Sequence, residues 1–279
     1  MGTRAVTRQA SLAKRAASVN SPIRRAASSP PLVDPTEQIE LVATELFIRN
    51  GYHGVSYLGI GKELGITHSN VHYYYRTKAA LATAVLKRVA KETLQATEGI
   101  WTDRDTTLAE KFVRMRDWTF DSYLRFNPDG RGGRPWGLLS RFSMEADALT
   151  PEMRQSVRAT LLKLEDSIRA AVEISIASRE LVHDAPVEGV TLQISSVMYL
   201  TGQLTRHASG FSRLDELLMW TITGLLKAYG GKSRSVIVWP AIPGRGPGSG
   251  PGPKASVTKR ATPELATSRS NPTLLKDTT

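Results

Sequence analysis

Apolar residues recur at steps of three and four between residues 34 and 230, and this period predicts α-helices. The first predicted helix starts after Asp34, a good N-cap, with Pro35 at its first position and Glu37 at the capping-box position. Asn50-Gly51 ends it. Its apolar face consists of Ile39, Val42, Ala43, Leu46 and Phe47.

Hydroxyl residues mark the starts of the next three predicted helices. Ser56 caps a short helix that ends at Gly65, and Thr67 caps another from His68 to Tyr75. Thr77 caps a longer helix, with Leu81, Val85 and Val89 on its buried stripe. Gly65 permits the left-handed backbone of a tight bend. The two short helices are held together by Ile60, Leu64, Ile66 and Val71. This arrangement predicts a helix-turn-helix.

The second half of the chain continues the helical pattern. We expect helices over Leu108–Phe126, Leu138–Ala146, a long segment opened by Thr150-Pro151, and Pro186–His207. A last helix, with a capping box from Ser212 to Asp215, ends at Gly230-Gly231. No segment has a convincing strand pattern, so the predicted fold class is all-α.

The composition divides the chain into four parts. Residues 1–33 form a predicted disordered basic arm rich in Ala, Ser, Arg and Pro. This composition also resembles that of a transit peptide. Residues 34–80 are the predicted helix-turn-helix unit. Residues 81–232 are a second predicted helical domain, to which the family resemblance described below assigns regulation and dimerisation. Residues 233–279 are a predicted disordered, Gly/Pro-rich basic tail.

The net charge of +11 lies mostly in the two ends. Residues 1–34 carry six Lys and Arg against one acid, and residues 240–279 carry six against two, which leaves +2 for residues 35–239. Basic ends indicate attraction to a polyanion but do not read sequence. The chain has no Cys, which excludes disulfides and thiol chemistry, and no apolar run of roughly 18 residues. We expect a cytoplasmic protein.

The predicted packing displays polar side chains on the third helix and beside it. They are Thr67, His68, Ser69, Asn70, His72, Tyr73 and Tyr74. Such a helix fits the major groove of DNA, where short polar side chains read base edges. Tyr and His hold phosphates, and Lys78 near a helix N-terminus strengthens an anion site.

The stretch GYHGVSYLGIGKELGITHSNVHYYYRTKAALATAVL resembles the DNA-binding region of TetR-family transcriptional regulators, and the resemblance covers Thr36 to about Val89. It implies a three-helix unit joined by a long helix to a ligand-binding and dimerisation domain. The residues that it assigns to DNA contact are Ser56, Tyr57, His68, Ser69, Asn70, His72, Tyr73, Tyr74 and, for a phosphate, Lys78. Gly59, Gly61 and His72 depart from the family's usual residues.

The resemblance also implies a homodimer, an operator with near-palindromic symmetry, a small-molecule effector and, most often, repression. Aromatic and Met residues of the second half are candidates for the effector pocket: Trp101, Met115, Trp118, Tyr123, Trp136 and Phe142. Arg116, Arg141 or Glu145 would orient a polar group of the effector. Ordinary core packing explains the aromatic residues equally well.

The last two helices, around Val187–Leu204 and Leu214–Tyr229, are the predicted dimer face. Their apolar rows are Val190, Ile194, Val197, Leu200 and Leu204, and Leu218, Ile222, Leu225 and Leu226. The segment from Pro35 to Ala80 has no net charge, so we expect Arg24 and Arg25 to act as an arm that reaches the DNA.

Other functions have less support in the sequence. No catalytic constellation, Walker loop or dinucleotide fingerprint is present, so we expect neither an enzyme nor a cofactor. His68 and His72 have metal-ligand spacing on a helix but lack a third ligand nearby, so no metal site is predicted. A helical adaptor that binds another protein, without sequence-specific DNA binding, remains the alternative.

Overall fold

The structure is a computed structural model that describes residues 34–231 and 237–242. The described residues up to Trp239 belong to one compact unit, and those from Pro240 belong to another. Within the described ranges the chain forms α-helices and one short 3-10 helix, with two isolated β-bridges and no strand. The all-α prediction is confirmed.

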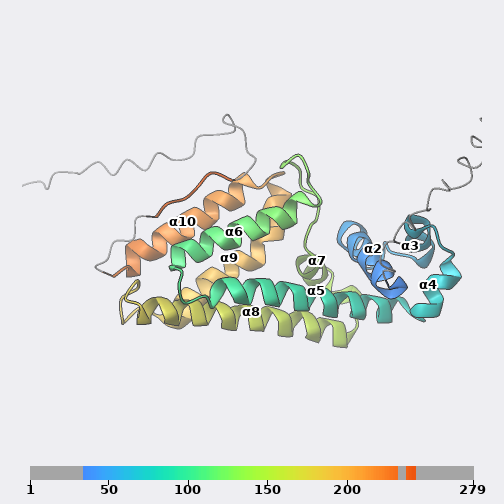
Figure 1. The fold of residues 1–279 in the computed structure, drawn as a ribbon, viewed down its shortest axis with the longest axis horizontal. Helices are drawn as coiled ribbons and strands as arrows, with labels where there is room; N and C mark the ends of the chain where they lie inside the picture. Colours follow the sequence, from blue (N-terminus) through green and yellow to red (C-terminus); the bar gives the residue numbers. More distant parts are fainter. Residues whose placement is uncertain (1–33, 232–236, 243–279) are drawn as a thin grey trace, which may run out of the picture. The chain divides into compact units, whose positions relative to one another are not determined.

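Three helices form the N-terminal part, which we call the head: α2 (Pro35–Asn50), α3 (Tyr57–Leu64) and α4 (His68–Tyr74) (Figure 1). The carboxylate of Asp34 accepts the amide of Thr36 at 3.0 Å, as expected of an N-cap. Gly51 follows α2 with φ at 74°, in the left-handed region that favours glycine.

The turn between α3 and α4 is built as the sequence predicts. Gly65 has φ at 68° and ψ at 26°, so it takes the left-handed conformation. Ile60 and Val71 are fully buried between the helices, and Leu64 and Ile66 pack against them. A Cβ on Gly61 would lie 2.6 Å from the carbonyl oxygen of Ile66, so this glycine allows the close approach of the two helices.

The remaining helices form what we call the body: α5 (Lys78–Trp101), α6 (Leu108–Leu124), α7 (Leu138–Met144), η1 (Ala146–Ala148), α8 (Pro151–Ala177), α9 (Val187–His207) and α10 (Ser212–Tyr229). The long helices α5 and α8 run side by side; α9 packs on α8, and α10 packs on α9 and α6 (Figure 1). Both α6 and α7 end two residues earlier than predicted. Phe211 is the N-cap of α10 without a side-chain capping bond, so the predicted capping box is wrong.

The head and the body share one hydrophobic core. Helix α2 packs against α5 and α7, and the core runs from Ile39 of α2 through Leu86 of α5 to Met153 of α8. The amide of Tyr52 donates to the Glu145 carboxylate at 2.8 Å, and Arg141 pairs with the same carboxylate at 2.7 Å. A Cβ on Gly51 would collide with Glu145. The end of α2 is therefore joined tightly to the body.

The apolar rows predicted for the dimer face lie mostly inside the chain. Six of their members are buried: Val190, Ile194, Val197, Leu218, Ile222 and Leu225. The prediction that these six are left exposed by the monomer is wrong, because α9 and α10 pack against each other and against α8 and α6. The large apolar residues exposed on the same two helices are Leu192, Leu200 and Trp220.

Charged side chains are buried around the start of α6. Glu180 accepts the amide of Leu108 at 2.8 and 3.0 Å. Lys111 is fully buried and donates to carbonyl oxygens of Asp103 and Thr106. Burial lowers the pKa of Lys111. These groups connect the loop before α6 to the rest of the body.

The segment Ile237–Trp239 belongs to the same compact unit as the helices, although the sequence predicts a tail from residue 233. The indole N–H of Trp239 donates to Asp215 of α10 at 3.0 Å. The Arg116 guanidinium lies 5.0 Å from the centre of its ring. Of the predicted disordered segments, residues 1–33, 233–236 and 243–279 lie outside the described residues, as does residue 232.

Candidate nucleic-acid interface and cavity

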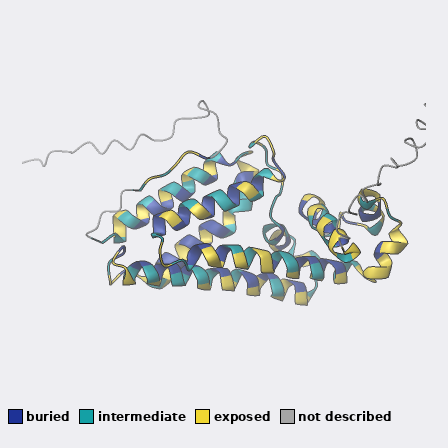
Figure 2. Ribbon diagram, in the orientation of Figure 1, coloured by how far each residue is buried: buried dark blue, intermediate teal, exposed yellow. Residues whose placement is uncertain are grey.

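The outer face of α4 consists of exposed polar and aromatic residues (Figure 2). They are the seven expected from the sequence: Thr67, His68, Ser69, Asn70, His72, Tyr73 and Tyr74. Tyr73 is 80% exposed. Within the described residues, the side chains of His68, Ser69 and Asn70 make no hydrogen bond or ion pair. Their donors and acceptors are therefore available to a ligand outside the chain.

Both ends of α4 are fixed. At its start, the hydroxyl of Thr67 accepts the amide of Asn70 at 3.3 Å. At its end, the hydroxyl of Tyr75 donates to the Glu40 carboxylate of α2 at 2.5 Å. Burial first, and then this hydrogen bond, raise the pKa of Tyr75, so it stays a neutral donor. The helix is held as a rigid, outward-facing element although it has only two turns.

The start of α3 lies beside α4. The hydroxyl of Ser56 accepts the amide of Gly59 at 3.1 Å. Tyr57 is half-buried, and its ring meets that of His72 edge to face at 6.0 Å. Burial raises the pKa of Tyr57, whose hydroxyl has no hydrogen-bond partner among the described residues. His72, which departs from the family's usual aromatic residue, is thus held by an aromatic neighbour.

Lys78, the predicted phosphate contact, is the first residue of α5. Its ammonium donates to the carbonyl oxygen of Val55 at 3.3 Å and lies 4.8 Å from the centre of the Tyr52 ring. An ammonium has three N–H groups, so one carbonyl partner does not exhaust it. These contacts hold the cation beside the head. Arg24 and Arg25 of the predicted arm lie outside the described residues.

A cavity of about 490 Å³ lies between the head and the body. Three of the six predicted pocket residues line it: Met115, Trp118 and Trp136. The other three are packed elsewhere in the core. Trp101 contacts Phe112, Tyr123 donates to the carbonyl of Gly132 at 2.8 Å, and Phe142 packs on Phe47 and Tyr52.

The polar residues proposed to orient an effector do not line this cavity. Arg116 is buried and pairs with Asp117 at 2.6 Å, while Arg141 and Glu145 hold the end of α2. Sequence reasoning missed the charged groups that do line it, which include Arg88 and Arg125. The available signal was a charged residue, Arg88, directly beside the apolar stripe of its helix.

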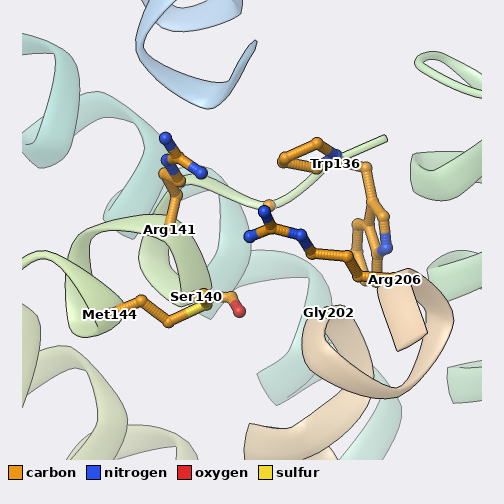
Figure 3. A pocket seen from close by; sticks show the side chains of 8 residues that line it. Trp136, Ser140, Arg141, Met144, Gly202 and Arg206 are labelled. Carbon is orange, nitrogen blue, oxygen red and sulfur yellow. The ribbon is translucent and has the colours of Figure 1, made fainter. Parts of the chain in front are cut away.

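A second, much smaller pocket opens between α7 and α9 (Figure 3). Trp136, Ser140, Arg141, Met144, Gly202 and Arg206 surround it. Its volume of about 10 Å³ holds at most one water molecule. A Cβ on Gly202 would lie 2.6 Å from the hydroxyl oxygen of Ser140, so this space reflects a close helix crossing.

Two negative features concern only the part of the chain that the structure describes. No helix there is both long and apolar enough to cross a membrane. No group of three or more His, Cys, Asp or Glu residues is placed there to hold a metal ion.

Residues 41–85 match the model for bacterial regulatory proteins of the tetR family. A search of curated protein sequences finds no match to the chain. Among solved structures, a TetR transcriptional regulator from Chloroflexus aurantiacus is 19% identical with a TM-score of 0.59, and the match covers 70% of this chain and 96% of that one. A TetR-family regulator from Agrobacterium tumefaciens is 18% identical with a TM-score of 0.59, covering 70% and 97%.

The reduced form of NemR from E. coli is 13% identical with a TM-score of 0.58, and the match covers 71% of this chain and 98% of that one. At these identities the likeness shows a shared fold. The matched N-terminal segment contains α3, α4 and parts of α2 and α5, the elements that present the exposed polar face.

Proposed function

Because the chain has the N-terminal region and the fold of the TetR family of bacterial regulators, we propose that it is a DNA-binding transcriptional regulator, acting as a repressor. The observation that carries this proposal is the outer face of α4. Its side chains are exposed, and those of His68, Ser69 and Asn70 make no hydrogen bond or ion pair within the described residues, while both ends of the helix are fixed by hydrogen bonds.

The major groove of B-DNA admits an α-helix and presents a distinct donor and acceptor pattern for each base pair. An exposed Asn70 amide suits adenine, and His68 and Ser69 supply further donors and acceptors. Further residues on and around this face are proposed to hold the phosphate backbone or the edges of the groove. They are Ser56, Tyr57, Thr67, His72, Tyr73, Tyr74 and Lys78.

A homodimer would place two copies of α4 in successive major grooves, about 34 Å apart, on a near-palindromic operator. The exposed apolar residues Leu192, Leu200 and Trp220 on α9 and α10 support a dimer face there. Aromatic residues are enriched in the centres of such interfaces.

The cavity supports a response to a small molecule, since its volume falls within the range typical of ligand sites. An effector would act through its unequal affinity for two arrangements of the head, by tilting α5 and changing the separation of the two reading helices.

The decisive experiment selects binding sites for the purified chain from random DNA duplexes. We expect a near-palindromic sequence to be enriched. Replacement of Asn70 by Ala should weaken binding of that sequence by about tenfold to a hundredfold, since one bidentate base contact is worth about 1–3 kcal/mol. Lys87→Ala, which removes an exposed cation from α5, is the matched control and should change affinity little.

If no sequence is enriched and Asn70→Ala binds duplex DNA like the unmodified chain, the adaptor alternative replaces the regulator. The arm is tested separately. Deletion of residues 1–30 should reduce the slope of log affinity against log salt by about 2, because Arg24 and Arg25 each release about one counterion. An unchanged slope would remove the arm from the proposal.

A further inference from the structure

The large cavity is bounded by the head as well as the body. Helix α2 contributes Leu41, Thr44, Glu45 and Ile48 to its wall, and the other lining residues come from α5 to α9 and the loop before α7. An occupant would therefore touch the first helix of the DNA-binding head directly. Its effect on the head does not have to travel through the length of α5.

The wall of the cavity is mainly apolar, with Trp118, Trp136, Met115 and Phe126 among its side chains. Such a wall accommodates an aromatic or aliphatic body. Several Ser and Thr hydroxyls on the wall already donate to carbonyl oxygens of their own helices, such as Thr97 to Thr93 and Ser122 to Trp118. The charged residues on the wall offer the stronger interactions with a ligand.

The charged residues on the wall differ in whether they already have a partner of opposite charge. Both carboxylates already hold an arginine: Glu45 pairs with Arg49 at 3.2 Å, and Glu92 pairs with Arg88 at 3.3 Å. Arg125, at the end of α6, makes no hydrogen bond or ion pair within the described residues. The unsatisfied charge at the cavity is thus positive, which favours an anion.

Of the two arginines that line the cavity, Arg88 is the one that is bonded to both the head and the body. Its guanidinium donates to the Glu40 carbonyl at 3.2 Å and to the Thr44 hydroxyl at 2.7 Å, both on α2. Its Nε lies 3.3 Å from the Glu40 carboxylate without hydrogen-bond geometry. Its pair with Glu92 is the exposed one, since the Glu92 side chain is 60% exposed. A ligand anion would displace Glu92 most easily and then compete for the bonds to α2.

Glu40 connects Arg88 to the end of α4. Its carboxylate also accepts the hydroxyl of Tyr75, the residue that ends α4. Both Glu40 and Arg88 are largely buried, at 18% and 21% side-chain exposure, so their pairing is stronger than that of surface ions. Loss of Arg88 would leave this carboxylate without its cation and would loosen the end of α4.

We propose that the effector is an apolar anion, with an aromatic or aliphatic body and one acidic group, and that this group binds Arg88 in competition with Glu40 and Thr44 of α2. Arg125 assists from the end of α6. The ligand then leaves the largely buried Glu40 carboxylate without its cation, so this carboxylate turns toward water and releases the Tyr75 hydroxyl. Loss of that hydrogen bond mobilises α4 and lowers DNA affinity. This inference rests on the proposed function and adds the ligand class and the route of regulation.

The test uses two probes with the same rings: 1-anilinonaphthalene-8-sulfonate, an aromatic anion, and N-phenyl-1-naphthylamine, which lacks the sulfonate. Fluorescence titration of the full chain measures both. We expect Arg88→Gln and Arg125→Gln to weaken binding of the sulfonate by about tenfold, the effect of losing a charged hydrogen bond, and to leave the neutral probe unchanged. Lys87→Gln, which removes an exposed cation next to Arg88, is the control.

Arg125→Gln keeps this test decisive if Arg88→Gln fails to fold, because Arg125 is exposed and its replacement breaks no bond. Equal losses for both probes, or no loss for either, would overturn the assignment of an anionic ligand.

Hydrogen exchange of the α4 amides tests the route. The Tyr75 amide donates to the Val71 carbonyl at 2.9 Å and reports the end of the helix. The sulfonate should speed its exchange several-fold. The neutral probe should not, and the sulfonate should have no further effect in Arg88→Gln. Unchanged exchange with the sulfonate bound would overturn the coupling. Neither measurement involves DNA, so either can fail while the selected operator still supports the regulator.

Discussion

The outer face of α4 and the start of α6 use polar side chains in opposite ways. On α4, His68, Ser69 and Asn70 are exposed and have no partner within the described residues. At α6, Lys111 and Glu180 are buried and satisfy backbone groups of neighbouring segments. We therefore expect the first set to contribute little to the stability of the fold and the second to contribute much more. Polar residues that the fold does not use are the ones to examine for function.

The largest expected effect follows from making the same substitution at a buried position of α6 and at an exposed position of the head. Lys111→Met should lower the free energy of unfolding by about 3 kcal/mol, because it leaves the carbonyl oxygens of Asp103 and Thr106 without the donor that they share. Lys62→Met, at an exposed position on α3, should change it by less than about 0.5 kcal/mol. Urea denaturation measures both. Similar losses of unfolding free energy in the two variants would mean that the buried lysine stabilises the fold no more than the exposed one.

The next effect concerns apolar surface on the body. Trp220 is 59% exposed on α10. In the proposed dimer, Trp220→Glu should weaken association by about thirtyfold or more, since buried aromatic anchors are worth about 2 kcal/mol. Sedimentation at several concentrations measures this. Leu58→Glu, at a 71% exposed position on the head, should leave association unchanged. A tryptophan variant that associates normally would place the interface elsewhere.

Two glycines of α3 provide a smaller contrast within the head. Gly61→Ala should destabilise the chain by about 1–3 kcal/mol, because its Cβ would lie 2.6 Å from the Ile66 carbonyl oxygen. At Gly59 the nearest neighbour of a Cβ is the Ser56 hydroxyl at 3.5 Å, so Gly59→Ala should stabilise it by about 0.5–1 kcal/mol. Thermal unfolding distinguishes them. If both substitutions changed the stability in the same direction, the turn would have relaxed around the added methyl group of Gly61→Ala.

The smallest effect depends on pH. The amide and hydroxyl of Thr107 donate to Glu110 at 2.7 and 2.9 Å and lower the pKa of its carboxyl below the ordinary 4.5. This stabilisation is therefore present above pH 4.5 and is lost as the pH falls through the lowered pKa. Glu110→Gln should cost about 0.5 kcal/mol at neutral pH and less in acid. Melting curves across this range test the prediction, which a pH-independent cost would contradict.

The sequence predicts local features of this fold well. Asp34, Ser56, Thr67 and Thr77 cap the helices expected of them, and Gly65 takes the left-handed turn. These features depend on residues within one turn of each other, so the pattern contains the whole cause. The exposed face of α4 follows from the same local geometry once Val71 is placed in the core.

Long-range packing was not predictable in the same way. Trp118 lines the cavity whereas Trp101 is buried in the core, yet the sequence made both of them candidates for the effector pocket. The stripe of Ile194 on α9 packs inside the chain, although an apolar stripe suits a partner subunit equally well. Arg88 acquires its role from Glu40, which is distant in sequence. Such assignments depend on which helices meet, and a single sequence does not specify that.

Gly51 limits how this molecule can change. Its backbone is left-handed, which strains any residue with a Cβ, and the Glu145 carboxylate occupies the space that a Cβ would need, so a substitution there has to displace the Glu145 and Arg141 side chains as well. The surface of α4 has no comparable restriction. In the proposed regulator, exposed residues of α4 can therefore be exchanged to alter DNA preference while the joint beneath the head is kept.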